Sequence, residues 1–170
     1  MVQISKAIGA RVVATAGNDK KVELCRRLGA DLVINYKTQN VEVELKKISP
    51  AGVNVWWETQ REPNFDVAVG ALSARGRMIL MAGREARPPF PVGPFYVKGC
   101  SLHGFAMFMA NQEEQEDAAD DINRWLAEGK LKANIDRVLP LSQAAEAHRL
   151  QEENTIGKSG TLVGKIVLKP

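Results

Sequence analysis

The 170-residue sequence has only two cysteines, two histidines and 6% aromatic residues. Cys25 and Cys100 lie far apart, with no CxxC pair and no cluster of metal-ligating residues around them. This excludes a disulfide scaffold and gives no sign of a metal site. The apolar runs are far shorter than the ~20 residues that span a bilayer, and no signal-peptide pattern follows Met1. We therefore expect a cytoplasmic protein that has no membrane partner.

The charges are nearly balanced, with 23 Lys and Arg against 20 Asp and Glu, which leaves a formal net charge of +3. The basic residues alternate with acids and form no block of the kind that binds nucleic acid. We expect no nucleic-acid partner. A hydrophobic fraction of 45% and a charged fraction of 25% are typical of a folded globular chain.

Short apolar runs, many of them β-branched, alternate with helical patterns along most of the chain. These runs cover residues 12–13, 32–34, 53–57, 78–81 and 101–105. Several of them are apolar without alternation, which is typical of strands buried on both faces of a parallel sheet. The sequence therefore predicts an α/β fold.

Capping residues and glycines mark the helices between these runs. Asn18 can cap a helix that Gly29 ends, and further helices are expected over residues 41–48, 65–72 and from about 112 to 128. The last of these is expected to bury Ala118, Ile122, Trp125 and Leu126. Residues 84–94 hold four prolines and predict an irregular connection. Beyond Gly129 we expect a strand over 135–139, a helix over 142–151, a loop over 157–160 and a strand over 162–168.

The residues that follow the strand expected at 12–13 carry the clearest chemical signal. A parallel sheet binds ligands at the carboxyl ends of its strands, and an NAD site usually has an acid there for the ribose hydroxyls. Here the strand is followed by Gly17 and Asn18, with Lys21 one helical turn later, which favours a 2′-phosphate and hence NADP(H). As alternatives, Asn18 is only a helix cap, Lys21 is a solvated lysine, and Asp19 serves a ribose.

Five segments of the chain resemble the medium-chain dehydrogenase/reductase superfamily, in the family's order and spacing. They are IGARVVATAG (8–17), CRRLGADLVINY (25–36), ALSARGRMILMAG (71–83), LSQAAEAHRL (141–150) and GKIVL (164–168). The nearest branch is the zinc-free quinone oxidoreductases. The resemblance implies a Rossmann-like doubly wound parallel sheet, NADP(H) as cofactor without zinc, a small quinone or enone substrate, and a homodimer joined through residues 101–105.

The resemblance also implies which residues contact the cofactor. Those matched to the 2′-phosphate site are Asn18, Lys21 and Tyr36, and Gly17 beside them is also assigned to cofactor binding. Those matched to backbone contacts with the nicotinamide are Ala82, Gly83, Gly104, Phe105 and Ala106. Ordinary strand-end packing is the alternative for the second group. His148 matches a helix position without a chemical role. No catalytic and no metal-binding side chain is assigned.

The sequence departs from the family pattern at its amino-terminal end. Residues 2–8 match only the back half of the first helix, so the first strand and its glycine-rich turn are lacking. We expect residues 1–130 to form the dinucleotide-binding domain and residues 131–170 a segment that in the family completes the catalytic domain. The position of the missing strand is expected to be filled by upstream residues, by direct pairing of its neighbours, or by residues 162–168.

The sequence is therefore interpreted as the cofactor-binding portion of an NADPH-dependent oxidoreductase, similar to quinone or enone reductases. Whether it acts as an enzyme is left open. The alternative is a non-catalytic, truncated nucleotide-binding or dimerisation module. An enoyl-reductase module of a polyketide synthase is less favoured, because no linker or carrier-domain sequence flanks the chain.

Overall fold

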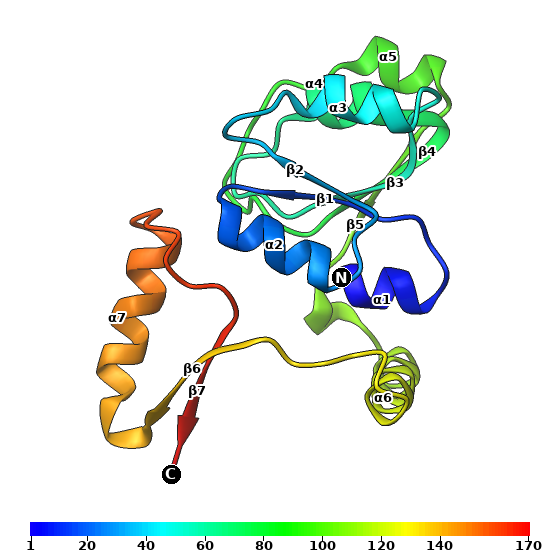
Figure 1. Cartoon of the computed structure of the whole chain (residues 1–170). Coiled ribbons are helices and arrows are strands. Elements are labelled where there is room, and N and C mark those ends of the chain that lie inside the picture. The colour runs from blue at the N-terminus through cyan, green and yellow to red at the C-terminus, as the bar shows by residue number, and fades with distance from the viewer. The chain divides into compact units, whose positions relative to one another are not determined.

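Every strand pairing in the computed structural model is parallel, which confirms the α/β class. The structure describes all 170 residues and divides into two compact units, Met1–Thr38 with Ala118–Pro170, and Gln39–Asp117. Figure 1 shows the order of the elements along the chain. The expected boundary near residue 130 stays a prediction. None of the helices is long and apolar enough to cross a membrane.

The first part of unit 1 is a strand, helix and strand that follow a short helix. Its elements are α1 (Val2–Ala7), β1 (Val13–Ala16), α2 (Asp19–Arg27) and β2 (Leu32–Asn35). Asn18 caps α2 by accepting a 2.9 Å hydrogen bond from the Lys21 N–H, and Gly29, at φ +96°, follows the end of the helix. Val22 packs against Ala16 and Val33 in a small core, as the spacing of apolar residues predicts.

The second part of unit 1 contains the carboxyl-terminal elements. They are α6 (Gln112–Ala127), which begins in unit 2, then β6 (Ile135–Pro140), the 3₁₀ turn η2 (Leu141–Gln143), α7 (Ala144–Thr155) and β7 (Lys165–Lys169), with β6 and β7 paired. The expected burial along α6 is wrong except at Trp125, since Ala118, Ile122 and Leu126 are exposed. The amphipathic pattern of α6 thus predicts an apolar face that is exposed except at Trp125.

The final strand begins three residues later than the sequence predicts. The Leu162 N–H donates to the Asn154 side chain at 3.0 Å, and the Val163 N–H donates to Asp136 at 2.7 Å. Because side chains take these amide groups, residues 162–164 form no strand and β7 starts at Lys165.

Unit 2 contains a three-stranded sheet, and the α-helices over residues 41–48, 65–71 and 92–97 lie on one side of it (Figure 1). The elements are α3 (Val41–Ile48), β3 (Val53–Glu58), α4 (Phe65–Ala71), β4 (Leu72–Leu80), α5 (Val92–Val97), β5 (Ser101–Gly104) and η1 (Met107–Met109). The strands lie in the order β3-β4-β5. The core is formed by Ala68, Val69, Leu72 and Met78.

The proline-rich segment is only partly irregular, because residues 92–94 begin α5. Pro94 lies in the first turn of this helix, where its missing N–H costs no helical hydrogen bond. Phe90, which precedes the helix, makes edge-to-face ring contacts with Phe65 at 5.2 Å and with Phe95 at 5.0 Å between centroids. Aromatic packing thus anchors residues 84–91, the part of this segment that forms no strand or helix.

No other strand of the chain pairs with β1 or β3 in place of the missing first strand. β1 pairs only with β2, β3 pairs only with β4, and β7 pairs with β6. The two expectations of direct pairing and of replacement by residues 162–168 are therefore wrong. The third, in which upstream residues fill the position, stays a prediction.

Candidate cofactor-binding site

Gly17 and Tyr36 make a close contact at the carboxyl ends of β1 and β2. The Tyr36 N–H donates to the Ala16 carbonyl at 3.1 Å, which brings the tyrosine beside the turn that follows β1. A Cβ atom placed on Gly17 would lie 2.7 Å from the Tyr36 Cζ atom. Only glycine at position 17 therefore lets the phenol ring lie over this turn. The ring is half exposed and can still meet a ligand.

The Asn18 side chain connects this turn with the carboxyl-terminal part of unit 1. Its Oδ1 atom accepts from the Lys21 N–H, and its Nδ2 atom donates to the Gly160 carbonyl at 3.3 Å. The helix-cap interpretation is therefore confirmed. Asn18 uses both ends of its amide within the chain, so it acts mainly by fixing the turn and the Gly160 loop together.

Lys21 and Lys37 provide positive charge just after the carboxyl ends of β1 and β2. Lys21, on the first turn of α2, is half-buried and forms no ion pair, whereas the Lys37 ammonium lies 5.8 Å from the centroid of the Tyr36 ring. Asp19, the alternative ribose partner, accepts a 3.2 Å hydrogen bond from the Asn35 amide. The sequence reasoning missed Lys37, although its place directly after Tyr36 could have revealed it.

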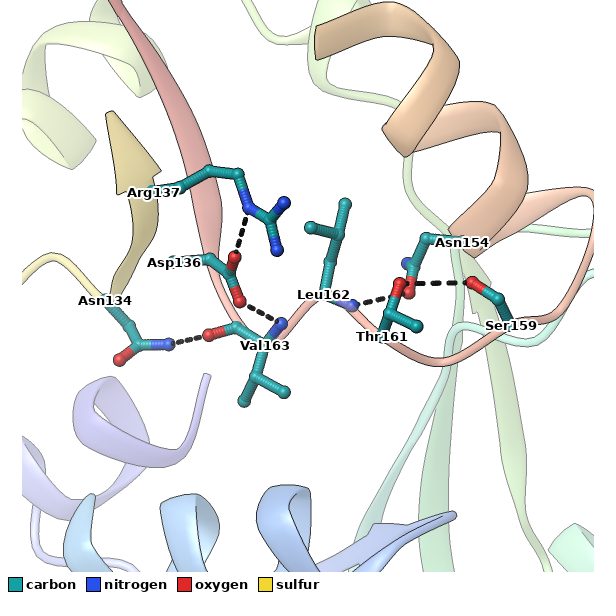
Figure 2. A network of polar contacts seen from close by, with 8 residues as sticks. All are labelled: Asn134, Asp136, Arg137, Asn154, Ser159, Thr161, Leu162 and Val163. Carbon is teal, nitrogen blue, oxygen red and sulfur yellow. Dashed lines mark hydrogen bonds and ion pairs between the residues drawn. The ribbon is translucent and has the colours of Figure 1, made fainter. Parts of the chain in front are cut away.

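The loop that carries Gly160 is held by a polar network (Figure 2). Asn134 donates to the Val163 carbonyl at 2.7 Å, and Asp136 accepts from the Val163 N–H and from the Arg137 guanidinium. The Val163 N–H, followed by the Arg137 contact, lowers the pKa of Asp136 below its ordinary value. The network keeps the polypeptide next to Asn18 in one conformation, and nothing in the sequence pattern predicts it.

In unit 2 the predicted residues lie at the carboxyl ends of β4 and β5. Gly83 has φ +82°, and a Cβ atom there would lie 3.1 Å from Pro63 Cδ and 3.2 Å from the Arg61 carbonyl oxygen. The Phe105 N–H donates to the Leu80 carbonyl at 2.9 Å, so the backbone after β5 is tied to the end of β4. The turn at 82–83 and residues 104–106 therefore lie at the same end of one sheet.

Glu58 ends β3 and is almost fully buried, with 2% of its surface exposed. Its carboxylate accepts a 3.0 Å hydrogen bond from the Trp56 indole and a 2.8 Å hydrogen bond from the Gln60 N–H. These bonds satisfy both carboxylate oxygens and fix the loop that packs on Gly83.

The exposed face of this sheet holds an open hollow. It is lined by Val55, Arg77, Ile79, His103, Gly104 and Phe105. Two of the predicted contact residues, Gly104 and Phe105, thus line a depression, whereas Ala82 and Gly83 do not. No group of three or more His, Cys, Asp or Glu side chains is placed to hold a metal ion, so we assign no metal ligand.

Parallel strands with small and cationic residues at their carboxyl ends define a Rossmann-like, nucleotide-binding class of protein. A family model described as zinc-binding dehydrogenase matches residues 1–124. The chain belongs to this family, within the medium-chain dehydrogenase/reductase superfamily and its quinone oxidoreductase-like branch. The resemblance found in the sequence is confirmed.

Similar proteins include a quinone oxidoreductase from Sus scrofa, 30% identical over 98% of this chain and 49% of that protein. A trans-enoyl reductase from Aspergillus terreus is 33% identical over 99% of this chain and 47% of that protein. Among solved structures, a 2-haloacrylate reductase is 26% identical, with a TM-score of 0.82, covering 100% of this chain and 53% of that one. The chain spans about half the length of the curated relatives that it matches.

Proposed function

We propose that this chain binds NADPH and forms the cofactor-binding portion of an NADPH-dependent reductase of quinones or enones. The observation that carries the proposal is the arrangement at the end of β1, where Tyr36 lies over Gly17 and Lys21 follows one turn later. A ribose-binding acid is lacking directly after the strand, and Asp19 accepts a hydrogen bond from Asn35. This arrangement suits a phosphate better than a free 2′-hydroxyl.

In this proposal each residue of unit 1 has a separate task. Lys21 pairs with the 2′-phosphate, Tyr36 provides its hydroxyl and ring, and Asn18 keeps the turn in place. The amino-terminal end of α2 adds a favourable field for an anion. Gly17 keeps space for the phenol ring, as its close approach to Tyr36 requires.

Unit 2 contributes the surface for the nicotinamide. We assign this role to Ala82, Gly83, Gly104, Phe105 and Ala106. The Phe105 N–H is already bonded to Leu80, so Phe105 contributes its ring rather than its amide. The bound cofactor supplies the hydride, and the chain's own residues hold and orient it. No side chain of this chain is assigned a proton-transfer role.

The substrate, the assembly and the absence of zinc are proposed from the family. A small quinone or enone is the proposed substrate, and a homodimer through β5 is the proposed assembly. All four residues of β5 are exposed, and Leu102 exposes 41% of its surface, so the edge is open to pairing. Light scattering tests the dimer, and we expect Leu102→Lys to shift it toward the monomer. The cytoplasmic location stays a prediction.

A non-catalytic nucleotide-binding or dimerisation module is the second candidate. It requires only the turn at the end of β1 and the exposed strand β5, both of which lie in this chain. Titration of the chain with NADPH, NADH and 2′,5′-ADP tests the shared binding step. We expect NADPH and 2′,5′-ADP to bind more tightly than NADH. Equal affinities for NADPH and NADH would reject the phosphate site, and quinone reduction by the chain would exclude the second candidate.

A further inference from the structure

Two arginines follow neighbouring strands at the carboxyl end of the unit 2 sheet. Glu58, at the end of β3, is in register with Leu80, at the end of β4. Arg61 lies just beyond the first strand and Arg84 just beyond the second. Both arginine residues are exposed. Two arginine residues on adjacent loops therefore lie at the end of the sheet where parallel sheets bind ligands.

The two loops are in direct contact and are held in place. The Arg61 carbonyl oxygen would lie 3.2 Å from a Cβ atom on Gly83, the residue directly before Arg84. Pro63 is buried against the same turn, and Glu58 fixes the start of the loop through the Gln60 N–H at 2.8 Å. The backbones that carry the two arginines are thus fixed relative to each other.

Neither arginine forms an ion pair with an acidic side chain. Glu62 follows Arg61 and Glu85 follows Arg84, yet none of the ion pairs in the chain involves any of these four residues. Arginine forms paired hydrogen bonds with the two oxygens of a carboxylate or a phosphate. Two unpaired guanidinium groups on fixed, touching loops therefore suit an oxyanion.

We propose that Arg61 and Arg84 form an oxyanion-binding site beside the 82–83 turn, which takes a phosphate or carboxylate group. The identity of its ligand rests on the proposed function. In a reductase the oxyanion belongs either to the diphosphate of the cofactor or to a substrate that is an α,β-unsaturated carboxylate. The site itself requires only the two arginines and the packed loops beneath them.

The test follows the backbone amide signals of Ala82, Gly83 and Arg84 by NMR in the full chain. Inorganic pyrophosphate is one probe and crotonate the other, both added at constant ionic strength. The Arg61→Gln/Arg84→Gln variant removes the site. The Arg27→Gln/Lys46→Gln variant is the control, since it removes the same charge from two exposed positions on α2 and α3.

We expect saturable shifts with at least one probe, an affinity about tenfold or more lower in the arginine variant, and a change within about twofold in the control. Tighter binding of pyrophosphate assigns the site to the cofactor, and tighter binding of crotonate assigns it to the substrate. The proposal is overturned if neither probe gives saturable shifts, or if both variants weaken binding equally. NADPH binding without oxyanion binding rejects this site alone, whereas oxyanion binding without NADPH binding rejects the cofactor function alone.

Discussion

Lys98 donates a 2.8 Å hydrogen bond to the carbonyl oxygen of Leu72, the residue at which α4 passes directly into β4. The same ammonium donates to the Val69 carbonyl at 2.8 Å and to the Gly70 carbonyl at 3.0 Å. A helix leaves its last carbonyl groups without partners, and here one lysine satisfies several of them. This contact lets the chain change from helix to strand without a connecting loop.

Replacement of Lys98 by Met should therefore destabilise the protein. The variant keeps most of the aliphatic chain but leaves carbonyl groups unsatisfied, and we expect a loss of about 1.5–3 kcal/mol in the free energy of unfolding. Urea denaturation measures it. Lys46→Met, at an exposed position of α3, is the control and should change stability by less than about 0.5 kcal/mol. Equal effects of the two substitutions would show that the carbonyl contacts contribute nothing.

Gly17→Ala should disturb the contact with Tyr36. The added methyl group would meet the phenol ring at the Tyr36 Cζ atom, 2.7 Å away, and we expect the ring to move and stability to fall by about 1–3 kcal/mol. In the Gly17→Ala/Tyr36→Ala double variant the clash is absent, so the Gly17→Ala substitution should cost much less stability there than in the wild-type chain. A double-mutant cycle measures this difference. Additive effects of the two substitutions would contradict the contact.

Gly164→Ala should weaken the pairing of β6 with β7. Gly164 has φ +137°, and a Cβ atom there would lie 2.6 Å from the Asn134 carbonyl oxygen. Gly129→Ala is a matched control, because Gly129 also has a positive φ of +68° but has no atom within 4 Å of its Cβ position. We expect Gly164→Ala to cost about 1–3 kcal/mol more than the control in thermal unfolding. Equal losses would mean that backbone strain alone matters.

Asp136 should make the stability of unit 1 depend on pH. Its pKa is lower in the folded chain, so its stabilising effect is complete above the pKa of the unfolded chain and is lost as the pH falls through the folded value. Asp136→Asn should therefore reduce stability at pH 6 and have a smaller effect near pH 2. Urea denaturation at both pH values measures this difference. A loss that does not change with pH would show that the Asp136 charge contributes nothing.

The sequence predicts the elements whose signals are local. The Asn18 cap, the Gly29 stop and the apolar strands all depend on neighbouring residues, and the structure confirms that each of them forms. The strand expected over 78–81 begins earlier, at Leu72, a residue expected to end a helix. The family resemblance led to Gly17 and Tyr36, which the structure places in contact. Their assigned role in binding stays a prediction.

Features that depend on distant residues could not be predicted. Asp136 lies 27 residues before Val163 and takes its amide group, and Asn154 takes that of Leu162 from the preceding helix, so that the last strand begins later. The exposure of Ile122 has a similar origin, because an amphipathic pattern shows which face of a helix is apolar but not whether another element covers it.

The central claim is that the end of β1 binds the 2′-phosphate of NADPH, and a comparison of cofactor affinities in Lys21→Ala tests it most directly. Calorimetric titration of the wild-type chain and the variant with NADPH and NADH gives the four affinities that are needed. We expect the variant to lose about 1.5–3 kcal/mol of binding free energy for NADPH and almost none for NADH. Equal losses for the two cofactors would contradict the claim.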